Sequence, residues 1–528
     1  MTETMDFKTK WTFRYVLAAL GFLLVTIIEG MMLRTQHINP EFVTPEHFYA
    51  VMTVHPLLGI YGYSYLAVMG AFYFLIPYLL KVEVYSRKIV MANFWLQTSG
   101  VMIIWIAGFT TSFNALYTLY WPLPVWFDRV SNVGAVVFTL GAAIVVVNIL
   151  LFSYNLFATL IKRKPLPGEP QQKIYRFRDY LKATFGLDRL SKAGREANKE
   201  EKRLYDTLPV FIVSVARGSV DTAINAFVIL SAGVLILVYA VPPLLGLGSM
   251  DPHAIDALIY KNWYWWGLDM IADGNVLMYA AGTWYLLIPV LVGRKLYGES
   301  VVRTVILVDL LVSLGVWSHH LYAETVQPLW MQLLSGQFIT AGEIFTIGLS
   351  MFASLMTIYL ARPIVFTPAL KFVLTSIFGF MLGAIAGIIQ ANHGLNVVLH
   401  NTQWVIGMHS HTMLLMGLGS LLFGVVYALI PMMINREMKS QLLVNLHLIF
   451  WITGTVVMDV AMGAAGLNGM LRRTIYSGGE FSLSMTWAFF GGVSIVIGFL
   501  CLLINLVQTL GFPTLFRVVT PRPAVSHG

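Results

Sequence analysis

The sequence predicts an all-α membrane protein with twelve transmembrane helices, and two observations carry this prediction. Of the 528 residues, 57% are apolar and only 11% are charged, with a mean hydropathy of +0.73, a composition typical of membrane proteins. The apolar residues also gather in runs long enough to cross a bilayer, which takes about 20 residues in a helix.

The apolar runs follow one another along the whole chain. They lie near 11–33, 47–80, 90–116, 131–161, 207–242, 262–293, 301–323, 330–361, 366–391, 402–434, 442–466 and 484–512. Several are longer than one span needs, so we expect those helices to tilt or to extend beyond the bilayer. A polar insertion at about 162–206 is expected to be a solvated cytoplasmic linker within a single domain, 1–528.

Lysine and arginine set the orientation, because cytoplasmic loops are enriched in both. With a cytoplasmic N-terminus, only five of the 34 Lys and Arg residues fall on the outer side. These five are Arg34, Arg129, Lys261, Arg472 and Arg473. The asymmetry predicts that both termini are cytoplasmic. It also explains the net charge of +8 without nucleic acid as a partner.

The tenth run carries two histidines, His409 and His411, inside an apolar stretch where a histidine is costly. Residues two apart on an α-helix point about 200° apart. The pair therefore suits two cofactors, one on each side of the helix, better than one metal. The alternative is a pair of core histidines satisfied by hydrogen bonds. The single cysteine, Cys501, excludes a zinc or haem site built on cysteine pairs.

Other polar residues stand inside apolar runs at a similar depth. His55 opens the second run, Asp269 and Asp273 lie four residues apart in the sixth, and His319 and His320 end the seventh. With the predicted orientation, all of these except Asp273 fall at the level of the tenth-run pair, close below the outer surface. This convergence predicts a layer of cofactors. Four other histidines are expected at the membrane edges as ordinary surface residues, namely His37, His47, His253 and His447.

In number and order, these features resemble subunit I of the haem-copper oxidase superfamily over nearly the whole chain. The resemblance implies that His55 and His411 hold a low-spin haem, that His409 holds a high-spin haem, and that His319 and His320 bind a non-haem metal. Both haems are expected to be b-type. The outer pair Arg472 and Arg473 matches arginines that hold haem propionates, with contact to anionic lipid as the alternative.

Departures from the family pattern point to its nitric oxide reductase branch, and most to the gNOR-like group. When Trp265 and Pro289 are aligned with the family's tryptophan and proline, Asp269 takes the position of the third metal histidine. Asp273 then falls where nitric oxide reductases carry a glutamate. Oxygen-reducing members need a tyrosine, and its two expected places hold Asp273 and Ser313. The alternative is that Asp269 pairs with an arginine or with a water molecule bound to a haem propionate.

The resemblance therefore implies a catalytic subunit that reduces two NO to N2O and water. A carboxylate beside imidazoles favours iron over copper. Asp273 is either a ligand or a proton donor. Glu343, with Asp309, forms a proton route or a hydrogen-bonded helix contact.

Several alternatives stay open. They are a terminal oxygen reductase of the same superfamily, an NO dismutase, and a haem-based electron carrier or sensor. The chain has no cytochrome c or copper domain, so electrons are expected from a partner subunit on the outer face, carrying cytochrome c or copper, or from quinol. The expected location is the inner membrane of a prokaryote.

Overall fold

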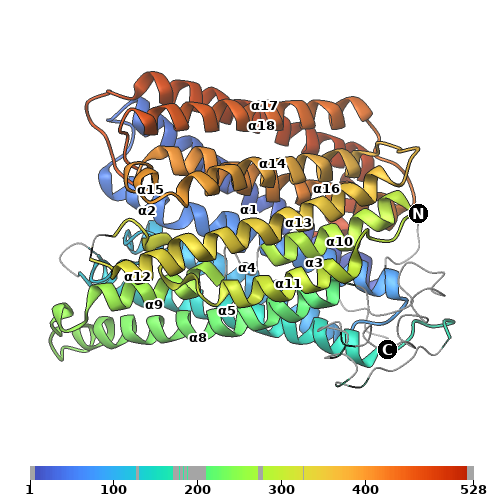
Figure 1. Ribbon diagram of the computed structural model, residues 1–528, viewed down its shortest axis with the longest axis horizontal. Helices are drawn as coiled ribbons and strands as arrows, with labels where there is room; N and C mark the ends of the chain where they lie inside the picture. The colour runs from blue at the N-terminus through green and yellow to red at the C-terminus, as the bar shows by residue number, and fades with distance from the viewer. Residues whose placement is uncertain are drawn as a thin grey trace.

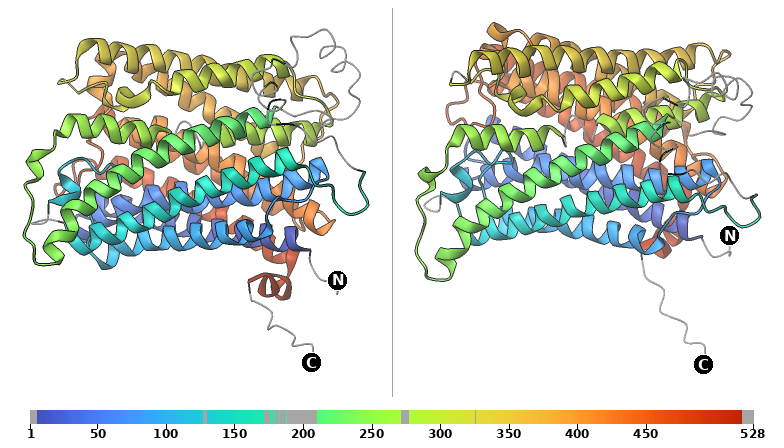
Figure 2. Two further views of the ribbon diagram at one scale, coloured as in Figure 1. Left: turned by 90° about the horizontal axis from the view of Figure 1, so that it is seen from below. Right: turned by 60° about the horizontal axis from the view of Figure 1, so that its bottom comes forward.

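The computed structural model describes residues 6–126, 130–170, 176, 178, 182, 187, 210–270, 277–324 and 326–519. Within these ranges the chain forms helices and two isolated β-bridges, and no strand. The helices run side by side along the long axis of one bundle (Figures 1 and 2).

The helices are labelled α, and segments with 3₁₀ or π hydrogen bonding are labelled η. In chain order they are α1 (Phe7–Ile38), α2 (Pro45–Leu57), η1 (Leu58–Ser64), α3 (Tyr65–Leu80), α4 (Arg87–Thr110), η2 (Leu123–Val125), α5 (Asn132–Lys162), α8 (Phe211–Leu244), η4 (Pro252–Ala254), α9 (Ala257–Asp269), α10 (Leu277–Val292), α11 (Glu299–Ser313), η6 (Val316–Leu321), α12 (Leu329–Met331), η7 (Gln332–Ile339), α13 (Thr340–Tyr359), α14 (Pro368–Gln390), α15 (His393–Leu399), η8 (Val405–Gly419), α16 (Ser420–Ile434), α17 (Gln441–Leu467), α18 (Ser482–Leu510) and α19 (Phe512–Val519).

The all-α fold class is confirmed. Ten helical segments of the described chain are long and apolar enough to cross a membrane. The predicted sixth and seventh spans consist of shorter pieces, α9 with α10 and α11 with η6. The count of twelve and the cytoplasmic placement of both termini therefore stay predictions. Most of the polar insertion lies outside the described residues.

Side chains at the N-caps explain where many of the helices begin. In each case an Asp, Ser, Thr or Asn oxygen accepts a hydrogen bond from a backbone N–H of the first turn, which would otherwise have no partner. These caps are Asp6, Thr44, Ser86, Ser131, Asp256, Thr367, Asn392 and Ser440. Two of them precede a proline at the first helical position, which favours the helix because proline has no N–H to satisfy.

Three of the η segments are π-helices, and each adjoins residues of the predicted site. η1 follows His55 within three residues, η7 packs against η6 with its His319 and His320, and η8 contains the tenth-run pair. π-Helical turns are rare and are frequently found at functional sites.

Close backbone contacts hold η8 between α14 and α17. A Cβ atom added to Gly379 of α14 would lie 2.4 Å from the backbone nitrogen of Gly417. A Cβ atom added to Gly466 of α17 would lie 2.1 Å from the backbone nitrogen of Trp404, which precedes η8. No side chain fits at either place, so glycine sets how closely these helices approach.

Two histidines expected at the surface are buried, and that prediction was wrong. His37 is 2% exposed, and its Nε2 lies 3.1 Å from the carbonyl oxygen of Thr474. His447 is 0% exposed, and its Nδ1 lies 3.0 Å from the hydroxyl of Tyr427. Loops and neighbouring helices cover both positions, which the distance of a residue from the end of an apolar run does not reveal.

Replacing Gly466 by valine is expected to destabilise the bundle by about 3 kcal/mol or more, because the new side chain meets backbone and the helices must separate. The measurement is the midpoint of thermal unfolding in detergent. Gly21→Val on α1 is the matched control, since a Cβ atom there meets nothing within 4 Å. Equal midpoints for the two variants would contradict the packing described here.

Candidate functional site

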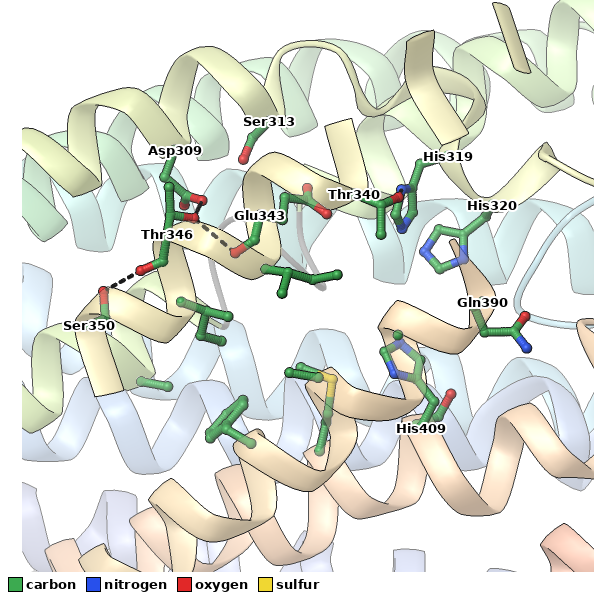
Figure 3. Close-up of a pocket in the computed structure, with 18 of the residues that line it drawn as sticks. Asp309, Ser313, His319, His320, Thr340, Glu343, Thr346, Ser350, Gln390 and His409 are labelled. Carbon is green, nitrogen blue, oxygen red and sulfur yellow. Dashed lines mark hydrogen bonds between the residues drawn. The ribbon is translucent and has the colours of Figure 1, made fainter. Parts of the chain in front are cut away.

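One cavity in the bundle brings together histidines that lie far apart in the sequence. His319 and His320 face it from η6, and His409 faces it from η8. Figure 3 shows the η6 pair on one side of this cavity and His409 on the opposite side. Glu343 of α13 and Asp309 of α11 line the same cavity. The structure thus brings these three histidines and the two carboxylates to one cavity.

The position of His320 is set by two neighbours from α9. Its Nε2 lies 2.7 Å from Oδ1 of Asp269, which is 1% exposed. Its ring stacks on Trp265, with ring centroids 4.5 Å apart and planes inclined by 29°. Asp269 therefore stands beside the histidine pair. Asp273, its predicted companion, lies outside the described residues.

Thr340 at the start of α13 orients His319. The threonine hydroxyl donates a hydrogen bond to the carbonyl of Gly336, so its oxygen accepts from Nδ1 of His319 at 2.9 Å. This arrangement leaves Nε2 of His319 as the nitrogen available to a metal. Ligating histidines commonly have their other ring nitrogen fixed in this way.

His319, His320 and Asp269 are residue types that bind metal ions, but their side chains do not converge on one point. Among the residues that the structure describes, no three His, Cys, Asp or Glu side chains come together closely enough to hold a metal. His320 and Asp269 instead contact each other directly. A metal held by both residues would therefore require Nε2 of His320 and Oδ1 of Asp269, now 2.7 Å apart, to separate.

Two of the other three histidines, His409 and His55, are also held through Nδ1. His409 donates to the carbonyl of Gly383 at 2.9 Å, and His55 donates to the carbonyl of Thr26 at 3.0 Å. Nδ1 of His411 lies 3.8 Å from Oδ1 of Asp459. The hydrogen bonds on His409 and His55 therefore direct Nε2 of each ring away from the bonded carbonyl, as in ligating histidines. His409 lines the cavity, whereas His411 is turned toward α17, as the spacing of the pair predicted.

Two buried carboxylates near the expected low-spin haem ligands were missed by the sequence analysis. Asp459 of α17 is 4% exposed, and its Oδ2 accepts a hydrogen bond of 2.9 Å from Thr412. Glu29 of α1 is 3% exposed and lies 4.0 Å from Nδ1 of His55. Each stands inside an apolar run, so the criterion that identified Asp309 would have found both.

A polar group gathers at the cavity end near the Arg472–Arg473 loop. The loop is fixed to the residues before η8, because the backbone N–H of Arg472 donates to the carbonyl of Asn401 at 2.9 Å. Arg472, His400 and Gln390 line the cavity. Each has one buried nitrogen without a hydrogen-bond partner among the described residues. Arg473 lies over the ring of Tyr120, 5.5 Å from its centroid.

This polar group is suited to bind carboxylates. Burial, together with the neighbouring Arg473, lowers the pKa of Arg472 to about 10, so its guanidinium stays cationic at neutral pH. Burial and the positive charge of Arg472 lower the pKa of His400 well below its usual range, so that ring is neutral. Arg472 is thus a buried cation whose Nε–H has no hydrogen-bond partner among the described residues, and such a group favours an anionic ligand.

The chain matches the family model described as Cytochrome C and Quinol oxidase polypeptide I over residues 10–500. It belongs to this family, subunit I of the haem-copper oxidases. The chain is therefore an oxidoreductase subunit and a multi-pass membrane protein.

The curated relatives and a solved structure agree with this assignment. The chain is 22% identical to the ubiquinol oxidase subunit 1 of Acetobacter aceti, over 93% of this chain and 69% of that protein. It is 23% identical to the cytochrome c oxidase subunit 1 of a Synechocystis strain, over 89% and 77%. A heme-copper terminal oxidase dimer has the same fold, with a TM-score of 0.72 and 19% identity over 98% of this chain and 85% of the other.

Family members bind haems and a non-haem metal, and the residues described here fit those groups. Gly387 leaves room for the ring of His409, because a Cβ atom there would lie 3.4 Å from its Cε1. Gly30 takes the same role beside His55, at 3.2 Å. The orphaned nitrogens of the polar group at the cavity end fit the carboxylates that a haem carries.

His411→Ala is expected to abolish the low-spin haem spectrum and to leave carbon monoxide binding at the other haem, because His411 points away from the cavity. Optical spectra of the reduced protein, with and without carbon monoxide, measure both. His409→Ala is the matched comparison and is expected to show the reverse pattern. A low-spin signal that survives in His411→Ala would refute the assignment of the two histidines.

Proposed function

We propose that this chain is the catalytic subunit of a membrane-bound nitric oxide reductase. The reaction joins two NO molecules with two electrons and two protons to give N2O and water. The observation that carries the proposal is the contact of Asp269 with His320, which adds a carboxylate to the two histidines. Haem iron and a non-haem metal, when bound, supply the electrons.

The metal expected here is iron. His319, His320 and Asp269 would hold it, with two imidazoles and one carboxylate as in many non-haem iron sites. The negative charge of the carboxylate stabilises the more oxidised metal and disfavours Cu(I). The low-spin haem is expected on His55 and His411, and the high-spin haem on His409.

The cavity gives the protein's own residues two further tasks. Its wall includes apolar residues such as Ile344, Ala384 and Val405, which suit a small, weakly polar gas. Glu343 lines this wall three residues after Thr340, which orients His319. We infer that Glu343 passes protons to the bound substrate. Asp273 is a second candidate for this task, or a further ligand.

The position of Ser313 supports the proposal. It is one of the two places where oxygen-reducing members need a tyrosine, and here its hydroxyl accepts a hydrogen bond of 2.6 Å from Arg217. Ser313 therefore contacts α8 through its hydroxyl. It has no phenol that could be oxidised during turnover.

Oxygen reduction is the second candidate function. The curated relatives are named as cytochrome c or ubiquinol oxidases, and one tyrosine, Tyr322 in the turn after η6, does line the cavity. Electrons for either reaction would come from a partner subunit on the outer face or from quinol. The expected setting is the inner membrane of a prokaryote.

Asp269→Asn is expected to weaken metal binding and to reduce NO turnover by about 10- to 100-fold or more, because it keeps the shape and removes the negative charge. Metal content, NO consumption and the low-spin spectrum are measured together, and the spectrum should not change. Asp256→Asn is the matched control, since asparagine also caps the start of α9. A metal held by His319 and His320 with Asp269 more than about 4 Å away would refute the ligand assignment.

Purified protein is expected to consume NO faster than O2 and to release N2O. Tyr322→Phe separates the two functions, because it removes only the phenol hydroxyl. NO turnover should persist in this variant. Faster consumption of O2 than of NO by the wild type, lost in Tyr322→Phe, would establish oxygen reduction instead. Release of N2 and O2 from NO would indicate dismutation.

A further inference from the structure

A buried ion cluster lies in the cavity wall, away from the histidines. Arg217 of α8 donates through Nε to Oδ2 of Asp221 at 3.2 Å, one turn further along the same helix. Its Nη1 forms an ion pair with Asp309 of α11, and its Nη2 donates to Ser313 at 2.6 Å. We refer to Arg217, Asp221 and Asp309 as the Arg217 triad.

The three side chains of the triad are almost entirely buried in the protein. Arg217 is 2% exposed, Asp221 is 0% exposed and Asp309 is 9% exposed. A buried ion costs several kcal/mol unless an opposite charge compensates it. The guanidinium is always protonated, and it compensates only one of the two carboxylates.

Among the residues that the structure describes, no cation from the helices packed around Arg217 balances the second carboxylate. The titratable groups that face Arg217 beyond the triad are Glu343 of α13 and Tyr285 of α10, and neither can carry a positive charge. With both aspartates ionised, the triad would have a net charge of minus one. A buried group in this position takes up a proton rather than remain an uncompensated ion.

The hydrogen bonds point to the same conclusion. Oδ1 of Asp221 is buried and has no hydrogen-bond donor among the described residues. An ionised carboxylate commonly collects several donors, whereas a protonated one needs fewer and can donate itself. Asp309 is better supplied, because the hydroxyl of Thr346 also donates to its Oδ1. Figure 3 shows Asp309 and Thr346 close to Glu343 and Ser313.

We infer that the Arg217 triad is a proton-holding site, which binds one exchangeable proton between its two aspartates and releases it into the cavity. On release, one carboxyl O–H bond breaks and a cavity water accepts the proton. Both carboxylates are then ionised beside Arg217. A proton taken up from solvent restores the state in which one aspartate is protonated. The site serves either candidate reaction, because the reduction of NO and of O2 both consume protons.

The cavity provides a way from the triad to the histidines. Arg217, Asp309 and Glu343 line the same cavity as His319 and His409. Asp309 precedes His319 by ten residues in the chain.

Infrared difference spectroscopy of the full-length protein, reduced minus oxidised, tests this inference without any gaseous substrate. We expect a protonated carboxylic acid C=O band that shifts in D2O. This band should be lost or shifted in Asp309→Asn and Asp221→Asn. Glu299→Gln is the matched control, because Glu299 also pairs with a buried arginine, Arg303, at 2.9 Å on α11. The band should be unchanged there.

This experiment tests the proton-holding site independently of the proposed function. Absence of the band in the wild type, or its persistence in both asparagine variants, would overturn the proton-holding site. If an asparagine variant fails to fold, Asp309→Glu keeps the acid and should shift the band; an unshifted band would overturn the inference. None of these results depends on whether NO or O2 is reduced.

Discussion

The close packing of η8 between α14 and α17 is the constraint on which the rest of the site depends. The backbones approach at Gly379 and Gly466 more closely than any side chain permits. From this fixed position His409 reaches the cavity and is bound by the carbonyl of Gly383. His411 turns to the other side, toward Asp459. One helix thus sets the separation of the two expected haem positions.

Hydrogen bonds on Nδ1 then make the histidines specific ligands rather than polar residues in an apolar bundle. In hydrocarbon an unsatisfied polar group is costly, so each ring must be anchored on one side before it offers the other. His55 and His409 use backbone carbonyls, and His319 uses a threonine oxygen. Asp459 and Glu29 place carboxylates near the low-spin pair.

The sequence predicted much of this arrangement, because polar residues in apolar runs are few and their depth follows from counting. It predicted the all-α fold and the grouping of His319, His320 and His409. It did not predict that α11 ends at Ser313 and continues as a 3₁₀ segment, because helix ends inside a bundle depend on packing. Nor could counting show that Arg217 reaches Asp309, since that contact joins helices whose facing sides are set only by the fold.

The break after α11 divides the site into two parts of different origin. The haem side is built on long helices whose contacts involve glycine backbones, so a change there disturbs the whole bundle. The metal side is carried by the six residues of η6 and by the last residue of α9. A ligand on such short pieces can be exchanged without rebuilding a helix. An ancestral scaffold of this kind could acquire a new metal, and with it a new substrate, through single substitutions on one side only.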